Sequence, residues 1–156
     1  MRTVWDMTPE ISAWVAKRIP HAHGRMGNVY YAVGVISEDL VPIAGVVYSD
    51  FYPDYGTIQV SVAADTARWA THGIVAEILA YPFFQLGAQK VWSAMPHDNT
   101  RAIRFNKGIG FKQEGILARQ FGDKHAVITR MFAEDYRRIY GTKPHGQKLP
   151  QSAACA

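Results

Sequence analysis

The order of hydrophobic periods along the chain is the strongest constraint on its fold. Segments rich in β-branched and aromatic residues follow one another closely at 29–36, 41–49 and 57–64, with short turn sequences between them. This spacing predicts three consecutive antiparallel strands. From Thr71 the apolar residues recur at helical spacing, which predicts a helix that ends at Gly87. The chain therefore combines a sheet with amphipathic helices.

The rest of the chain continues this alternation of helix and strand. Thr8 followed by Pro9 is typical of a helix start, and Pro20 ends the helix that follows. Pro82 should kink or loosen the helix that begins at Thr71, because it cannot donate a helical hydrogen bond. Further elements are predicted in this order: a strand at 89–95, a helix at 99–108, and a closing hairpin of strands at 116–121 and 126–132.

Length and composition fit one domain. A chain of 156 residues with 48% apolar content can bury one substantial core. We expect the domain at 1–140 and a flexible C-terminal tail at 141–156, where Gly, Pro, Lys and Gln give way to small neutral residues. Cys155, the only cysteine, lies in that tail. No intramolecular disulfide can form, which fits a reducing compartment.

Charge and hydropathy limit the classes of partner that the chain can have, but they do not identify one. The balance of 17 Lys plus Arg against 13 Asp plus Glu gives a net charge of +4. This excess favours an anionic ligand but lacks the pattern of a dedicated nucleic-acid-binding protein. No stretch approaches the roughly 18 apolar residues of a membrane span, so we expect no membrane partner and a cytoplasmic location. The histidines, including His21 and His23, lack metal-ligand spacing, and no metal is predicted.

One segment carries a recognisable signature. Residues 99–115 read NTRAIRFNKGIGFKQEG, so an asparagine is followed at fixed spacing by Gly-Phe and Glu-Gly. In this segment the chain resembles the GNAT superfamily of N-acetyltransferases, and within it the ribosomal-protein N-terminal acetyltransferases and their phage-encoded relatives. The order of elements matches over 1–136. The resemblance implies a single α/β (α+β) domain with a mixed, twisted sheet of about six to seven strands and helices on both faces. It also implies that the fourth and fifth strands splay apart to admit the pantetheine arm of acetyl-CoA.

The loop before the helix at Thr71 is the candidate site for the acyl donor. A helix N-terminus presents unpaired amides and a partial positive charge, which together suit a diphosphate. The resemblance implies a loop of the form [QR]-x-x-G-x-[GA]; Arg68 and Gly73 conform, but Thr71 stands where the first glycine is expected. Thr71 can cap the helix or narrow the approach of the diphosphate, and an ordinary capped helix start is the alternative. The residues predicted to bind acetyl-CoA are Val62, Ala63, Arg68, Trp69, Ala70, Thr71, His72, Gly73, Ile74 and Asn99.

The helix predicted at 99–108 carries two residues with implied roles. Asn99 can cap this helix, and the resemblance implies that it can also hydrogen-bond the pantetheine arm. In many relatives a tyrosine on this helix protonates the leaving thiolate, and the matching position here is Asn106. An amide is a poor proton donor. Either another residue substitutes for the tyrosine, or solvent protonates the thiolate.

Acyl transfer also needs a group that takes a proton from the amine and one that stabilises the oxyanion. Asp50 is a candidate base, although a solvated turn with aromatic packing is the alternative for this region. Ser93, on the predicted fifth strand, can relay a proton or can be a core serine bonded to the backbone. The candidate substrate-binding residues are Tyr48, Tyr52 and Tyr55, because relatives bind substrate where the third and fourth strands join.

Several functions remain open on the sequence alone. The leading hypothesis is transfer of an acetyl group from acetyl-CoA to a primary amine of a small molecule, peptide or protein, by direct attack in a ternary complex. The departures at Thr71 and Asn106 motivate an alternative, a catalytically impaired protein that binds CoA or a partner. A third hypothesis is acyl transfer to a nucleic-acid amine. A monomer and a homodimer are both compatible with the sequence.

Overall fold

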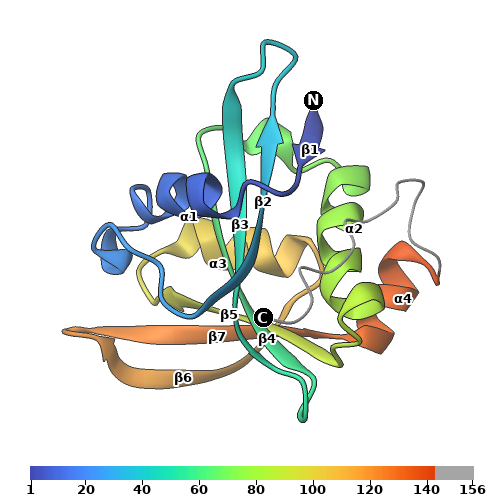
Figure 1. Ribbon diagram of the computed structural model, residues 1–156. Coiled ribbons are helices and arrows are strands. Elements are labelled where there is room, and N and C mark those ends of the chain that lie inside the picture. Colours follow the sequence, from blue (N-terminus) through green and yellow to red (C-terminus); the bar gives the residue numbers. More distant parts are fainter. Residues whose placement is uncertain (143–156) are drawn as a thin grey trace.

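The computed structural model describes residues 1–142, which form one seven-stranded mixed sheet flanked by helices (Figure 1). The strand order is β1-β2-β3-β4-β5-β7-β6. The strands are β1 (Arg2–Val4), β2 (Val29–Ile36), β3 (Pro42–Tyr52), β4 (Thr57–Ala64), β5 (Lys90–Pro96), β6 (Lys112–Phe121) and β7 (Lys124–Phe132). The helices are α1 (Thr8–Ala16), α2 (His72–Ala80), α3 (Thr100–Gly108) and α4 (Ala133–Tyr140), with short helical turns η1 (Pro20–Ala22), η2 (Ala67–Trp69) and η3 (Tyr81–Gln85). The α/β (α+β) fold predicted from the sequence is confirmed.

Helices cover both faces of the sheet. On one face, α1 packs Ile11 and Val15 against β2, β3 and β4. Two glycines allow this close approach: a Cβ on Gly34 would lie 2.5 Å from Ile11 Cδ1, and a Cβ on Gly45 would lie 2.6 Å from Val15 Cγ2. On the opposite face, α2 and α4 form the main core with the sheet, and Phe105 of α3 packs against it. We call the first face the α1 face.

Of the strand pairs within residues 1–142, only β4 and β5 run parallel, and they separate soon after they begin. Backbone pairing joins 57–59 of β4 to 90–92 of β5, ending at Gln59 and Trp92. Beyond this point β4 continues beside β3, and β5 continues beside β7. The two strands therefore diverge toward the N-termini of α2 and α3, as the resemblance implied.

The helix that begins after Thr71 changes its geometry at Pro82. Regular α-helix ends at Ala80, and η3 is a π-helical turn. Gly87 then adopts a φ of 68°, a conformation that glycine reaches without strain. The proline thus loosens the helix, and the glycine follows its end, as the sequence predicted.

The two ends of the described chain contain elements that the sequence did not predict. β1 has only three residues, too few for a periodic pattern. α4 follows β7 without a glycine or proline between them; instead the Asp135 side chain accepts a hydrogen bond from the Phe132 amide at 3.0 Å and starts the helix. The predicted domain boundary falls at the end of α4. Apart from Gly141 and Thr142, the predicted tail, including Cys155, lies outside the described residues.

None of the helices in residues 1–142 is long and apolar enough to cross a membrane.

Candidate active site

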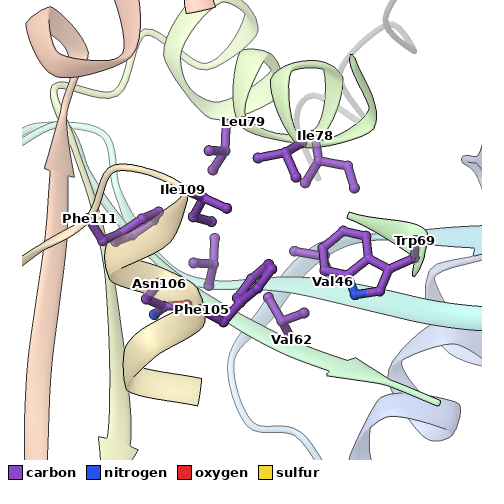
Figure 2. Close-up of a pocket in the computed structure, with 11 residues that line it drawn as sticks. Val46, Val62, Trp69, Ile78, Leu79, Phe105, Asn106, Ile109 and Phe111 are labelled. Carbon is purple, nitrogen blue, oxygen red and sulfur yellow. The ribbon is translucent and has the colours of Figure 1, made fainter. Parts of the chain in front are cut away.

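A small apolar cavity lies against β4 beside the point where this strand leaves β5 (Figure 2). Its volume is about 20 Å³, roughly the space that one water molecule requires. Side chains of β3 and β4 line the side formed by the sheet, and side chains of α2 and α3 approach from above and from the side (Figure 2). The lining residues are Val46, Val60, Val62, Trp69, Val75, Ile78, Leu79, Phe105, Asn106, Ile109 and Phe111.

Asn106 is the one polar side chain in this lining, and it is anchored beneath the diverging strands. Its Nδ2 donates to Thr129 Oγ1 at 3.1 Å and contacts Met95 Sδ at 3.4 Å. Ser93 lies directly opposite Thr129 in the pairing of β5 with β7, and all three polar residues are buried. The structure therefore brings the predicted residues Ser93 and Asn106 together around Thr129. Thr129 was not among the residues predicted from the sequence, although a threonine inside an apolar strand needs a hydrogen-bond partner.

An open, basic groove borders the cavity, and Phe105 lines both. The groove has a volume of about 310 Å³, and its other lining residues are Ala67, Thr100, Arg101 and Arg104. Both arginines are exposed. A guanidinium group binds phosphate oxygens through paired donors, so the groove suits a phosphorylated ligand. Neither arginine was among the predicted site residues, because a charged side chain on an amphipathic helix is usually solvated.

The N-terminus of α2 keeps amides available for an anion. Thr71 caps this helix, and its Oγ1 accepts a hydrogen bond from the Ile74 amide at 3.3 Å. The amides of His72 and Gly73 belong to the first turn and donate to no acceptor in the described part of the chain. A Cβ placed on Gly73 would meet no atom within 4 Å. The threonine at the expected glycine position is therefore a cap that leaves two amides open to solvent.

The N-terminus of α3 is capped by Asn99, whose Oδ1 accepts a hydrogen bond from the Ala102 amide at 3.2 Å. The capping role predicted from the sequence is confirmed. The side chain is exposed, and its Nδ2 donates no hydrogen bond within residues 1–142. This amide group remains available to a ligand.

Other residues predicted to bind acetyl-CoA belong to the core. Trp69 is buried, and its ring centroid lies 5.6 Å from that of Phe105. Val62 lines the cavity, whereas Ala63 is buried on the α1 face. Ala63 can therefore contact a ligand in the gap only through its backbone. Beyond Gln59 the edge of β4 that faces away from β3 is unpaired, so alternate N–H and C=O groups are available there.

The tyrosines predicted to bind the acceptor lie away from the cavity. Tyr48 is fully buried, its hydroxyl donates to the Ile78 carbonyl at 2.7 Å, and burial raises the pKa of this tyrosine well above its ordinary value. The expected substrate contact of Tyr48 is corrected, because its side chain is enclosed in the core. Tyr52 and Tyr55 are exposed, but they lie at the end of the sheet where β4 and β5 are still paired.

No carboxylate lines the cavity. Asp50, the predicted base, lies in an irregular stretch of β3 with a φ of 50°, where Asn28 Nδ2 donates to its Oδ1 at 2.9 Å. The structure does not bring Asp50 together with Ser93 and Asn106. Within the described residues, no three His, Cys, Asp or Glu side chains gather as the ligands of a metal would.

The diverging parallel pair, the order of the seven strands and the helices around them match the fold of solved N-acetyltransferase structures. Solved structures of Vibrio cholerae enzymes share it. A variant of the spermidine N-acetyltransferase SpeG matches with a TM-score of 0.62 and 14% identity, over 70% of this chain and 69% of that chain. A variant of the spermidine/spermine N-acetyltransferase SpeG matches with a TM-score of 0.64 and 15% identity, over 72% of each chain. SpeG in complex with manganese ions matches with a TM-score of 0.60 and 16% identity, over 72% of this chain and 70% of that chain. No protein-family model matches the sequence, and neither does any curated protein sequence.

Proposed function

We propose that this protein is an acyl-CoA-dependent N-acyltransferase that moves an acetyl group from acetyl-CoA to a primary amine by direct attack in a ternary complex. The observation that carries the proposal is the divergence of β4 and β5 beyond Gln59 and Trp92. It leaves an unpaired strand edge between two helix N-termini, with a small apolar cavity beside it and a basic groove nearby. An elongated thioester with an anionic end fits these features, because its anionic end suits the helix N-termini and the basic groove, its amides suit the strand edge, and its acyl group suits the apolar cavity.

Residues from three elements would hold the acyl donor. The free amides of His72 and Gly73, at the positive end of α2, suit the diphosphate. Arg101 and Arg104 of α3 would neutralise further phosphate charge. The unpaired edge of β4 would hydrogen-bond the amides of the pantetheine arm, and the cavity beside Asn106 has room for a methyl group. The volume of the cavity favours acetyl over longer acyl groups.

The amine would approach the thioester from the α1 face. On the opposite face α2, α3 and the main core fill the space. On the α1 face, Gln59, Trp92 and Ala94 are only half-buried beside the divergence. His21 of η1 lies against Phe121 at the end of β6, with ring centroids 4.3 Å apart. The loop after α1 and the β6–β7 hairpin thus meet and bound this part of the face.

The transfer breaks the thioester C–S bond and forms an amide C–N bond. The amine nitrogen must be neutral to attack, and it loses one proton while the leaving sulfur gains one. Because the cavity wall offers no carboxylate and Ser93 projects to the opposite face of the sheet with Thr129, the nitrogen would lose its proton to water. A thiol has a pKa of about 8.5, so solvent can protonate the leaving thiolate without a tyrosine acid.

Two kinds of acceptor fit this proposal. The solved structures with the same fold include enzymes named for spermidine, which supports a small amine. The resemblance of residues 99–115 to ribosomal-protein N-terminal acetyltransferases and phage-encoded relatives supports a peptide N-terminus. Both reactions would release free CoA. The proposed location is a reducing compartment such as the cytoplasm.

The proposal is tested by two measurements on the full chain. Calorimetric titration with acetyl-CoA should show saturable binding. Primary amines, peptides and nucleic-acid amines should then be compared for release of CoA thiol, and at least one should exceed the uncatalysed background. Binding without release from any acceptor would identify a CoA-binding protein that has lost the chemistry. Absence of binding would overturn the proposal altogether.

A further inference from the structure

The strand register places a row of side chains across the α1 face where β4 and β5 part. Gln59 pairs with Trp92, Trp92 with Arg130, and Arg130 with Lys112. Directly paired residues of neighbouring strands project to the same face of a sheet. Strands lie about 4.8 Å apart, so the backbone of Arg130 lies one strand from the divergence. The first charge along this row is positive.

Cations outnumber carboxylates around this row. Lys90 Nζ lies 2.8 Å from Glu114 Oε2, and Arg138 Nη2 lies 3.1 Å from Asp135 Oδ1. With Arg130 and Lys112, four cations therefore surround two carboxylates, and both carboxylates already have close partners.

Arg130 forms no close ion pair within this cluster, although its side chain is mostly buried. Its shortest distances to carboxylate oxygens are 3.7 Å to Asp135 and 4.0 Å to Glu114, longer than hydrogen bonds. Its Nε is buried and has no hydrogen-bond partner in the described part of the chain. The guanidinium carbon lies 4.4 Å from the centroid of the Phe132 ring, which supports the group from one side. The buried Nε cannot reach a ligand, but Arg130 keeps its Nη donors for a further anion, because the carboxylate oxygen closest to Nη1 lies 3.7 Å away.

We propose that Arg130 binds a carboxylate of the acceptor, so that the substrate is a small amine that also carries a carboxylate. This inference rests on the proposed function, because it assumes that the amine attacks beside Gln59 and Trp92. A polyamine would meet net positive charge here, and none of the four residues in the row is acidic. A molecule with its amine at the divergence and its carboxylate one or two strands away needs only a few bonds between the two groups.

Matched acceptors test the proposal directly. Thiol release from acetyl-CoA should be measured with 4-aminobutyrate and 5-aminopentanoate, with the corresponding amino alcohols, with an aminoalkyl phosphate, and with spermidine. The expected result is a kcat/KM about tenfold or more higher for an amino acid than for its amino alcohol, as a charge-assisted hydrogen bond would give. Preference for spermidine or the amino alcohols would overturn the proposal, and preference for the phosphate would replace carboxylate with phosphate as the bound anion.

Variants then assign the preference to Arg130. Arg130→Gln should remove the ratio between amino acid and amino alcohol, mainly through KM, while Lys17→Gln removes an exposed positive charge elsewhere and should keep the ratio. Arg130→Lys keeps the charge without the paired donors and should retain part of the ratio; it also serves if Arg130→Gln does not fold. An unchanged ratio in a folded Arg130 variant would overturn the assignment. Absence of thiol release with every acceptor, despite acetyl-CoA binding, would instead count against the proposed function.

Discussion

Asn106 of α3 donates a hydrogen bond to Thr129 of β7 at 3.1 Å, beneath the gap between the diverging strands. Both residues are buried, so each satisfies a polar group that would otherwise be costly to remove from water. At the position where the resemblance implies a tyrosine acid, this chain has an anchor between a helix and the sheet. The anchor also forms part of the cavity wall.

Replacement of this anchor should affect stability more than chemistry. Asn106→Ala removes the donor to Thr129 and should lower the free energy of unfolding by about 1–3 kcal/mol, as measured by urea denaturation. The rate of thiol release should change little, because neither an amide nor a methyl group is a useful acid. Asn106→Tyr would overfill a buried position, at a cost of about 1–3 kcal/mol. A collapse of the Asn106→Ala rate with unchanged acetyl-CoA affinity would show that the amide positions substrate or stabilises the oxyanion.

Gly73 offers a test of the diphosphate site with little structural side effect. A Cβ at this position would meet no atom within 4 Å, so Gly73→Val should change the free energy of unfolding by less than about 1 kcal/mol. It should nevertheless cover the first-turn amides and lower CoA affinity at least tenfold, about 1.4 kcal/mol, in a calorimetric titration. Gly108→Val is the matched control, because its added Cβ also meets nothing within 4 Å. Equal affinity in both variants would refute the placement.

Asn99 should prove to have two roles that can be separated by substitution. Asn99→Ala removes the cap of α3 and should lower the free energy of unfolding by about 1 kcal/mol. Asn99→Ser keeps an oxygen that can accept from the Ala102 amide, so it should restore most of that stability. Both variants lack the amide group and should bind CoA more weakly than the original chain. If affinity returns together with stability in Asn99→Ser, Asn99 is only a cap.

The stability of the fold should depend on the ionisation of Asp135. Burial alone raises the pKa of this carboxyl, but neighbouring donors and cations lower it below its ordinary value of 3.8: the Phe132 amide, Arg138, Lys112 and Arg130. A folded pKa below the unfolded one means that the stabilisation is present above about pH 4 and is lost as pH falls through the folded pKa. Asp135→Asn should therefore be less stable at neutral pH and should lose less stability on acidification. Urea unfolding of both proteins across that range measures this difference. Parallel pH profiles would contradict the assignment.

Local sequence signals predicted those parts of the fold that local physics determines. Periodicity located the three-stranded meander and the first two long helices, α1 and α2, because burial of one face imposes a period of 2 or 3.6 residues. Asn99 marked a helix start, and Pro82 marked the turn where α2 loses its regular geometry. The divergence of β4 and β5 came from the resemblance alone, since no local pattern states which strands are neighbours.

The remaining features depend on contacts between segments far apart in the sequence. Thr129 and Asn106 meet only because β7 lies beside β5 and beneath α3. Tyr48 lies in a strand whose alternation does not say which face α2 will cover, so its burial could not be read from the turn that follows it. Arg130 lies in the same row as Gln59 only because β4 pairs with β5 and β5 pairs with β7. The second of these pairs joins strands that are not consecutive in the sequence.

The short pairing between β4 and β5 has a consequence for the behaviour of the whole molecule in solution. The sheet consists of two half-sheets, β1–β4 and β5–β7, whose backbones pair with each other only over residues 57–59 and 90–92. A molecule bound in the opening would bridge both halves and oppose their separation. At 100 times its Kd such a molecule adds about 2.7 kcal/mol to the free energy of unfolding. The protein should therefore unfold at a higher temperature when a molecule occupies the opening between β4 and β5, whatever group is later transferred there.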